Sequence, residues 1–259
     1  MQLIASFTFF QDAQTLFVAI IAVFLVGLSK GGLGGAFALM GVPILSLVMP
    51  PIQAAALLLP ILLMMDAISV WTWRGWFDRA TLWYLLPSAM VGIAIGALTA
   101  AITSEAFVRL IVGLLALAFV VRMIVMRTGG PPQGQRRLSG SFWGAFAGFT
   151  SFVAHAGGPP FQVYALPLKL DPRLYTGTSV IFFAIINLVK VGPYAALGHF
   201  DMKTLLSAAA MLPLAAISTL LGAMIIKRIN AQVFYPFMYV MITLVGAKLV
   251  WDGIIAFWL

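Results

Sequence analysis

A lysine and two glycine pairs interrupt an apolar stretch near the start of the chain, "LSKGGLGGAFALMGVP". Lys30 opens the interruption, and Gly31, Gly34 and Gly35 stand within it. A helix that starts after such a break presents free backbone N–H groups and a partial positive charge at its N-terminus. With a lysine beside it, this is the chemistry of an anion-binding site. The alternatives are a lysine that extends to a polar interface and glycines that only allow close helix packing.

A second break of the same kind lies in "GFTSFVAHAGGPPFQVYALP". There His155 precedes Gly157 and Gly158, and Pro159 follows them. Proline suits the first turn of a helix, because its missing N–H would have no partner inside the helix. Two helix starts, one from each break, would converge on one pocket for an anion. For His155, a hydrogen bond that only packs helices is an equal alternative.

Three more polar residues fall inside apolar segments: Asp66, Asn187 and Lys190. An ionisable group inside a membrane costs about 2.5–3.5 kcal/mol on insertion scales and is a functional candidate by default. Asp66 and Asn187 occupy near-equivalent places in two halves of the chain, and Asp66, with His155, is a candidate for proton coupling. The alternative is an ion pair from Asp66 to Lys190 or to Lys30 that only holds helices together.

The candidate substrate contacts all lie at the two breaks or in the apolar segments beside them. Thr178 and Ser179 join them because their hydroxyls could bind an oxyanion, although such hydroxyls also bond back to their own helix. The full set is Lys30, Gly31, Gly34, Gly35, His155, Gly157, Gly158, Pro159, Gln162, Thr178, Ser179, Asn187 and Lys190.

The sequence carries no signature of an enzyme. With two histidines and no cysteine, it lacks the residues of a common metal cluster. The stretch "GGLGGA" has no βαβ context that would make it a dinucleotide loop, and no ATP-binding loop is present. We therefore expect no metal, no cofactor and no catalytic site.

Composition points to the membrane. Of the 259 residues, 63% are hydrophobic and 8% are charged, whereas soluble domains carry about 25% charged residues. The mean hydropathy is +1.08, and several apolar stretches approach the roughly 20 residues that span a bilayer as a helix. In such a protein the net charge of +8 marks cytoplasmic loops rather than a nucleic-acid partner.

The apolar segments predict helices, because lipid-exposed backbone must satisfy its own hydrogen bonds. The first residues lack the features of a cleavable signal peptide, so we expect the first helix to be retained. The predicted segments are 13–28, 36–50, 53–73, 81–101, 106–126, 141–155, 159–168, 174–197, 204–226 and 231–257.

The sequence indicates an internal duplication around a polar linker. "PSAMVGIAIGA" from Pro87 corresponds to "PLAAISTLLGA" from Pro213, and "WFD" ending at Asp78 corresponds to "HFD" ending at Asp201. We expect glycines 92, 96, 140 and 144 only to allow close helix packing. The predicted divisions are a first transmembrane repeat at 1–126, a cytoplasmic linker at 127–140 and a second repeat at 141–259.

Loop charge favours inverted over parallel repeats. If each broken unit makes two passes or none, each half crosses the membrane an odd number of times, and the basic loops gather in the cytoplasm as the positive-inside rule requires. We thus expect an all-α membrane protein of two inverted repeats, each with a glycine-broken helical hairpin, and about 8–10 membrane segments. Besides the linker, the cytoplasmic side then holds Arg74, Arg79, Lys169, Arg173, Lys227 and Arg228.

Three long stretches resemble the TauE/SafE family of bacterial sulfite exporters: "LSKGGLGGAFALMGVPIL", "PPIQAAALLLPILLMMDAISVW" and "GFTSFVAHAGGPPFQVYALPLKLDPRLYTGTSVIFFAIINLVK". The resemblance covers almost the whole chain. It implies transport of a small sulfur-containing anion, such as sulfite, sulfoacetate or another sulfonate, in the bacterial inner membrane. Family members differ in substrate and direction, so neither carries over.

These observations favour a secondary transporter that works by alternating access around a central anion site. Export of an anion runs down an inside-negative potential, worth about 2.3 kcal/mol per charge per 100 mV, whereas uptake needs a coupled ion such as a proton. The alternatives are a passive anion channel and a membrane protein without transport. The expected partners are the anion, membrane lipid and, through flat apolar faces, a second copy of the chain.

Overall fold

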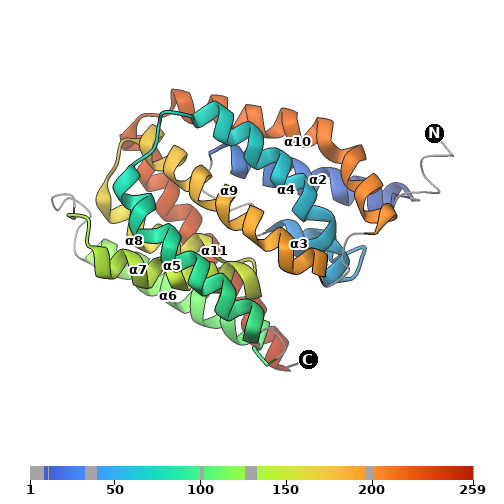
Figure 1. Ribbon diagram of the computed structural model, residues 1–259, viewed down its shortest axis with the longest axis horizontal. Coiled ribbons are helices and arrows are strands. Elements are labelled where there is room, and N and C mark those ends of the chain that lie inside the picture. Colours follow the sequence, from blue (N-terminus) through green and yellow to red (C-terminus); the bar gives the residue numbers. More distant parts are fainter. Residues whose placement is uncertain are drawn as a thin grey trace. The chain divides into compact units, whose positions relative to one another are not determined.

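The computed structural model describes residues 9–10, 12–32, 40–99, 102–125, 133–196 and 201–258. In these residues the chain is 86% helical and has no strand, which confirms the all-α prediction (Figure 1). Seven of the helices are long and apolar enough to cross a membrane, so this is a multi-pass membrane protein.

Most helices follow the predicted apolar segments closely, but in the described part of segment 36–50 only Gly41–Leu45 is helical and turns follow it. Helix α7 begins at Arg137, earlier than the predicted start at 141, so residues 137–140 of the predicted linker are helical. The elements are α2 (Ala13–Gly31), α3 (Gly41–Leu45), α4 (Pro51–Trp73), α5 (Arg79–Thr99), α6 (Glu105–Val125), α7 (Arg137–Val153), α8 (Gly158–Ala165), the 3-10 helix η2 (Leu166–Leu168), α9 (Pro172–Ala196), α10 (Met202–Arg228) and α11 (Ala231–Trp258).

Three membrane helices start with the same cap. An aspartate carboxylate accepts the backbone N–H of a threonine three residues later at 2.7 Å in α2, α5 and α10, where the aspartates are Asp12, Asp78 and Asp201. Hydrogen bonds from the side chain and backbone N–H of Thr204 also hold the pKa of Asp201 below its usual value. Asp78 and Asp201, which the proposed duplication pairs, cap their helices in the same way as Asp12 does, and the duplication itself stays a prediction.

The helices form two compact units. Unit 1 comprises Met1–Arg74 and Phe183–Arg228, and unit 2 comprises Gly75–Phe182 and Ile229–Leu259. Each unit therefore draws helices from both halves of the sequence, and the boundary between them falls inside α9. The two predicted repeats are defined by matching sequence, whereas the two units are defined by contacts in space, so the units do not test the repeats. The inverted arrangement stays a prediction.

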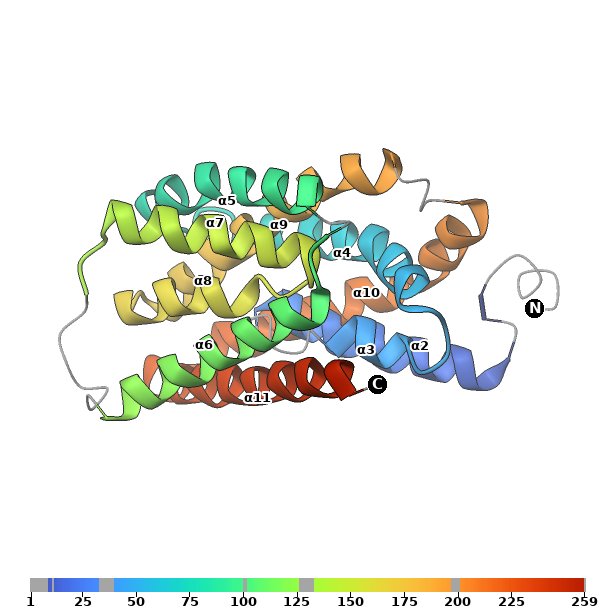
Figure 2. The same cartoon turned by 90° about the horizontal axis from the view of Figure 1, so that it is seen from below.

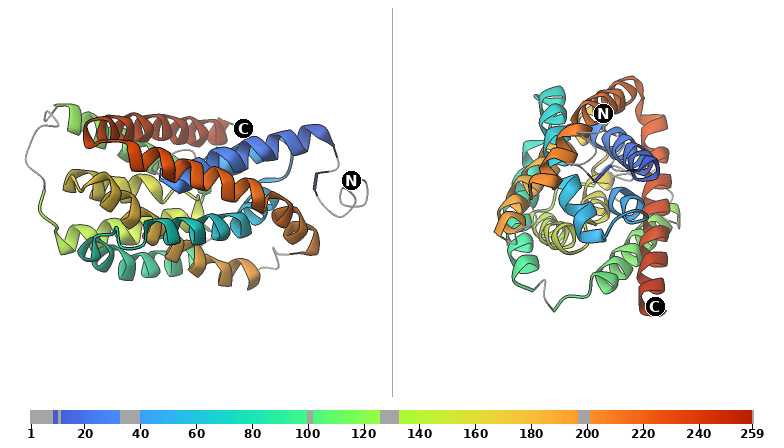
Figure 3. Two further views of the ribbon diagram at one scale, coloured as in Figure 1. Left: turned by 90° about the horizontal axis from the view of Figure 1, so that it is seen from above. Right: turned by 90° about the vertical axis from the view of Figure 1, so that its right-hand side faces the viewer.

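Close helix packing holds each unit together. In unit 1, α10 packs against α2 and α4 (Figure 3), and in unit 2 α5 packs against α7 and α6 against α11 (Figure 2). A Cβ at Gly92 of α5 would lie 1.9 Å from the carbonyl oxygen of Ala145 in α7. A Cβ at Gly222 of α10 would lie 2.2 Å from that of Leu28 in α2. The packing role expected for glycines 92, 96, 140 and 144 is confirmed, because a Cβ at each would meet a neighbouring side chain or backbone.

Gly92→Ala should destabilise the protein, because its methyl group would overlap backbone that cannot move without separating α5 from α7. Overpacking of this kind costs about 1–3 kcal/mol. Gly96→Ala is the matched control, since its Cβ would meet the nearest atom, in the Phe152 side chain, at 3.2 Å. Thermal unfolding of the detergent-purified protein should show a lower midpoint for the first variant. Equal midpoints would contradict the packing argument.

Candidate anion site

Three of the predicted site residues meet inside unit 1. The ammonium Nζ of Lys30, on α2, lies 2.6 Å from Oδ1 of Asp66, on α4. The amide Nδ2 of Asn187, on α9, donates to the other carboxylate oxygen at 2.6 Å. The side chains of Lys30 and Asp66 are 11% and 4% exposed, so the pair is well shielded. The Lys30–Asp66 ion pair anticipated as an alternative is present.

A second lysine adds positive charge to this cluster. Lys190 is buried in α9, three residues after Asn187. It interacts electrostatically with Lys30, which repels it, and with Asp66, which attracts it. The only other acidic residues in unit 1 are the helix caps Asp12 and Asp201. Two lysines therefore share one carboxylate, and the cluster has a formal charge of +1 when all three groups are ionised.

The first break begins just after Lys30. Helix α2 continues through Gly31, and Gly32 follows with φ 147° and donates its N–H to the carbonyl of Ser29 at 3.1 Å. That φ is accessible to glycine and rarely to other residues. Gly34 and Gly35 lie outside the described residues, and so does the expected helix start after Gly35. The next described helix, α3, has five residues and begins at Gly41.

Two side chains of α4 satisfy carbonyl groups at the end of α2. The hydroxyl of Ser69 donates to the Lys30 carbonyl at 3.0 Å, and the indole Nε1 of Trp73 donates to the Gly31 carbonyl at 2.9 Å. Sequence analysis missed both residues. Their spacing from Asp66, at i+3 and i+7, places all three residues on one face of α4. This spacing could have identified them from the sequence.

Two buried hydroxyls near the first break have no hydrogen-bond partner among the described residues. They belong to Ser29, which precedes Lys30, and to Thr219 of α10. The backbone of Thr219 lies against the end of α2, since a Cβ at Gly31 would be 2.2 Å from its carbonyl oxygen. Buried hydroxyls are normally bonded, so each marks a place for a water or a ligand oxygen.

The second break lies in unit 2 and depends on an unusual backbone at His155. This residue follows the last turn of α7 with φ 51°, the left-handed conformation that glycine usually supplies at a helix end. The N–H of Ala156 bonds to the Thr150 carbonyl at 3.0 Å, and the Thr150 hydroxyl donates to the Ala156 carbonyl at 3.2 Å. His155 therefore turns the chain after Ala154, the C-cap of α7, whereas at the first break Gly32 is itself the C-cap of α2.

Helix α8 offers fewer amide donors than expected. It begins at Gly158, one residue before the predicted segment 159–168, and Pro159 and Pro160 occupy its first turn. Proline has no N–H, and the N–H of Phe161 bonds to the Gly157 carbonyl at 3.3 Å. Of Gly158, Pro159 and Pro160, only Gly158 carries a backbone N–H. Apart from its chain neighbours and its own helix backbone, no described atom lies within 4 Å of where its Cβ would stand.

The remaining candidates also lie in unit 2. Gln162 is buried in α8. Thr178 donates its hydroxyl to the Leu174 carbonyl at 2.6 Å and accepts the backbone N–H of Asp78 at 2.8 Å. Its hydroxyl therefore bonds back to its own helix, as the alternative held, and also orients the cap of α5. Ser179 is half-buried. Because these candidates and the Lys30 cluster belong to different units, their convergence on one pocket stays a prediction.

Comparison with protein-family models matched residues 19–249 to the family described as Sulfite exporter TauE/SafE. The match spans both breaks and includes every candidate site residue. Comparisons with curated proteins and with solved structures gave no match. No group of three or more potential metal ligands occurs among the described residues.

Replacing His155 should separate its backbone role from its side chain. His155→Gly keeps the left-handed conformation available and should unfold at the same temperature as the wild type or above it. His155→Ala should unfold at a lower temperature, because a left-handed non-glycine residue costs about 1–2 kcal/mol and alanine tolerates it less well than histidine. Transport by the glycine variant then reports on the imidazole alone. A glycine variant less stable than the alanine variant would refute the backbone role.

Proposed function

Because the chain belongs to the TauE/SafE sulfite exporter family, we propose that it is a secondary transporter of sulfite or a small organosulfonate in the bacterial inner membrane. The family is one of membrane transporters, and seven apolar helices fit a multi-pass carrier. We further propose that it works by alternating access, with the buried cluster around Lys30 as part of its anion site.

The charge of this cluster is the observation that carries the proposal. Lys30 and Lys190 share the single carboxylate of Asp66 in an apolar setting. Burying charged groups is costly unless they are paired and hydrogen-bonded, so further acceptors for the two lysines are favourable. A sulfite or sulfonate group would bring a second negative charge and several acceptor oxygens, which form strong hydrogen bonds with ammonium groups.

The carboxylate of Asp66 also keeps the attraction moderate. A site with two lysines and no acid would hold an anion too tightly for release, whereas conduction needs a site that an ion both enters and leaves. Asp66 and the substrate compete for the same ammonium group of Lys30. Protonation of Asp66 would release Lys30 to the substrate, which is one way for a proton to be coupled to uptake.

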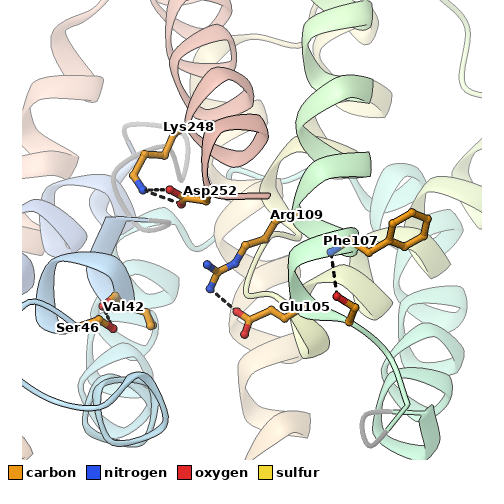
Figure 4. Close-up of polar contacts among 8 residues, drawn as sticks. Val42, Ser46, Glu105, Phe107, Arg109, Lys248 and Asp252 are labelled. Atoms are coloured by element: carbon orange, nitrogen blue, oxygen red, sulfur yellow. Dashed lines mark hydrogen bonds and ion pairs between the residues drawn. The ribbon is translucent and has the colours of Figure 1, made fainter. Parts of the chain in front are cut away.

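Lys30→Ala should abolish saturable sulfite flux into proteoliposomes, because it removes the ammonium group that would bind the anion. The matched control is Lys248→Ala. Lys248 also lies in a membrane helix and binds both carboxylate oxygens of Asp252 at 2.6 Å, but within one helix and with its side chain 40% exposed (Figure 4). We expect flux to fall at least about tenfold, or 1.4 kcal/mol, in the first variant only.

Because Lys30→Ala removes the ammonium group that bonds to the buried carboxylate of Asp66, it also lowers stability. The double variant Lys30→Gln with Asp66→Asn removes both charges and keeps similar volumes. It should unfold near the wild-type temperature and still lack flux. Saturable flux in this variant would rule out the Lys30 site while leaving the family assignment intact. Flux without saturation in the wild type would indicate a channel.

Asp66→Asn should raise the affinity for the anion, because it removes the competitor for Lys30 and keeps the side-chain shape. We expect KM for sulfite to fall about tenfold, or about 1.4 kcal/mol, and the response of flux to an imposed pH gradient to disappear. Asp252→Asn is the control, since that carboxylate also binds a lysine at 2.6 Å. An unchanged KM with an unchanged pH response would make Asp66 a packing residue only.

A further inference from the structure

A cleft of about 300 Å³ opens in unit 1 between the C-terminal ends of α4 and α10. Its lining includes Trp71 and Arg74 at the end of α4, and Leu220, Met224 and Lys227 in α10. The cluster around Lys30 does not use it. The volume lies at the lower end of the range for small-molecule sites in proteins, about 300–1,000 Å³.

Two cations are held at this cleft by aromatic rings. The guanidinium of Arg74 lies 5.3 Å from the ring centre of Trp71, and the ammonium of Lys227 lies 5.6 Å from that of Trp73. Trp73 is fully buried, and its N–H is bonded to the Gly31 carbonyl. The ring under Lys227 is therefore fixed. The cleft thus carries two positive charges whose positions are restricted, as a binding site for an anionic group requires.

The rest of the lining is apolar and accessible. Trp71, Leu220 and Met224 are 63%, 41% and 50% exposed, and all three belong to helices that can span the membrane. Arg74 follows the last residue of α4, and Lys227 is in the last turn of α10. Charge therefore lies at the ends of two spans, with apolar surface directly beside it. This arrangement matches an anionic phospholipid, in which a charged headgroup is joined to apolar acyl chains.

We propose that this cleft binds an anionic phospholipid, with its phosphate between Arg74 and Lys227 and its acyl chains along Leu220 and Met224. Basic pockets between membrane helices on the cytoplasmic side bind such headgroups, and the basic residues here belong to the set that loop charge assigns to the cytoplasm. A free phosphate ion would share the headgroup's interactions, but it would leave the apolar lining unused.

The bound lipid also supports the end of α2. Trp73 connects the two places, because its ring lies under Lys227 and its N–H binds the carbonyl of Gly31, the residue after Lys30. A headgroup that fixes Lys227 over this ring restricts the indole and, through it, the last turn of α2. The lipid therefore stabilises the helix end that carries Lys30.

The test measures lipid binding to the full-length protein in detergent, without transport, so its result is independent of the proposed function. Phosphatidylglycerol, phosphatidylcholine and sodium phosphate are added separately, and the thermal unfolding midpoint and the lipids retained in native mass spectrometry are recorded. The variant is Arg74→Gln with Lys227→Gln. The control is Arg173→Gln, which removes another arginine held over a tryptophan ring, 5.2 Å from the centre of Trp76.

We expect phosphatidylglycerol to raise the midpoint of the wild type and the control, with at least tenfold weaker binding and one fewer retained lipid in the double variant. Phosphatidylcholine and sodium phosphate should not reproduce the shift. Undiminished phosphatidylglycerol binding in the double variant would overturn the proposal. The proposal would also be overturned if sodium phosphate raised the unfolding midpoint as much as phosphatidylglycerol does and this shift required Arg74 and Lys227. The cleft would then be a site for soluble anions. Arg74 and Lys227 are both exposed, so the double variant should fold, and Lys227→Gln alone should weaken binding in the same direction.

Discussion

A lysine and a carboxylate that leave water for an apolar interior lose hydration that their mutual attraction alone does not replace. The pair of Lys30 and Asp66 therefore needs further partners, and Asn187 supplies one by bonding to the second carboxylate oxygen. These three residues come from α2, α4 and α9. The requirement to satisfy one buried carboxylate thus fixes the relative positions of three helices in unit 1, and the other contacts at the break build on that arrangement.

The end of α2 illustrates this dependence. A helix that stops inside a protein leaves carbonyl groups without partners, and α4 provides donors for two of them through Ser69 and Trp73. Both donors lie on the face of α4 that Asp66 already turns toward α2. The ion pair and the support of the helix end are therefore consequences of one helix face. The proposed anion would bind to this cluster, whose formal charge is +1 when Lys30, Asp66 and Lys190 are all ionised.

The apolar runs predicted the helices well, because length and hydropathy decide where a chain can cross a membrane. The equivalence of Asp66 and Asn187 in the two repeats stays a prediction, whereas their direct hydrogen bond is visible only in the structure. Sequence could not choose between Lys30 and Lys190 as the partner of Asp66, since that depends on how helices distant in sequence rotate against one another. It missed Trp73, whose bond to the Gly31 carbonyl depends on how α4 lies against the end of α2. At α8 the prolines correctly predicted a helix start, but they also remove two amide donors from its first turn, which the expectation of an anion-binding helix start did not consider.

The first turn of α8 bears on selectivity. Pro159 and Pro160 leave its positive end intact while removing directed hydrogen bonds from it. An anion at that position would be attracted by an electric field, which acts on charge and distance and is indifferent to the number or angle of oxygen atoms. Pyramidal sulfite and tetrahedral sulfonates would then be attracted to a similar degree. Discrimination between them would fall to the size of the space beside Gly158 and to groups that touch the rest of the substrate.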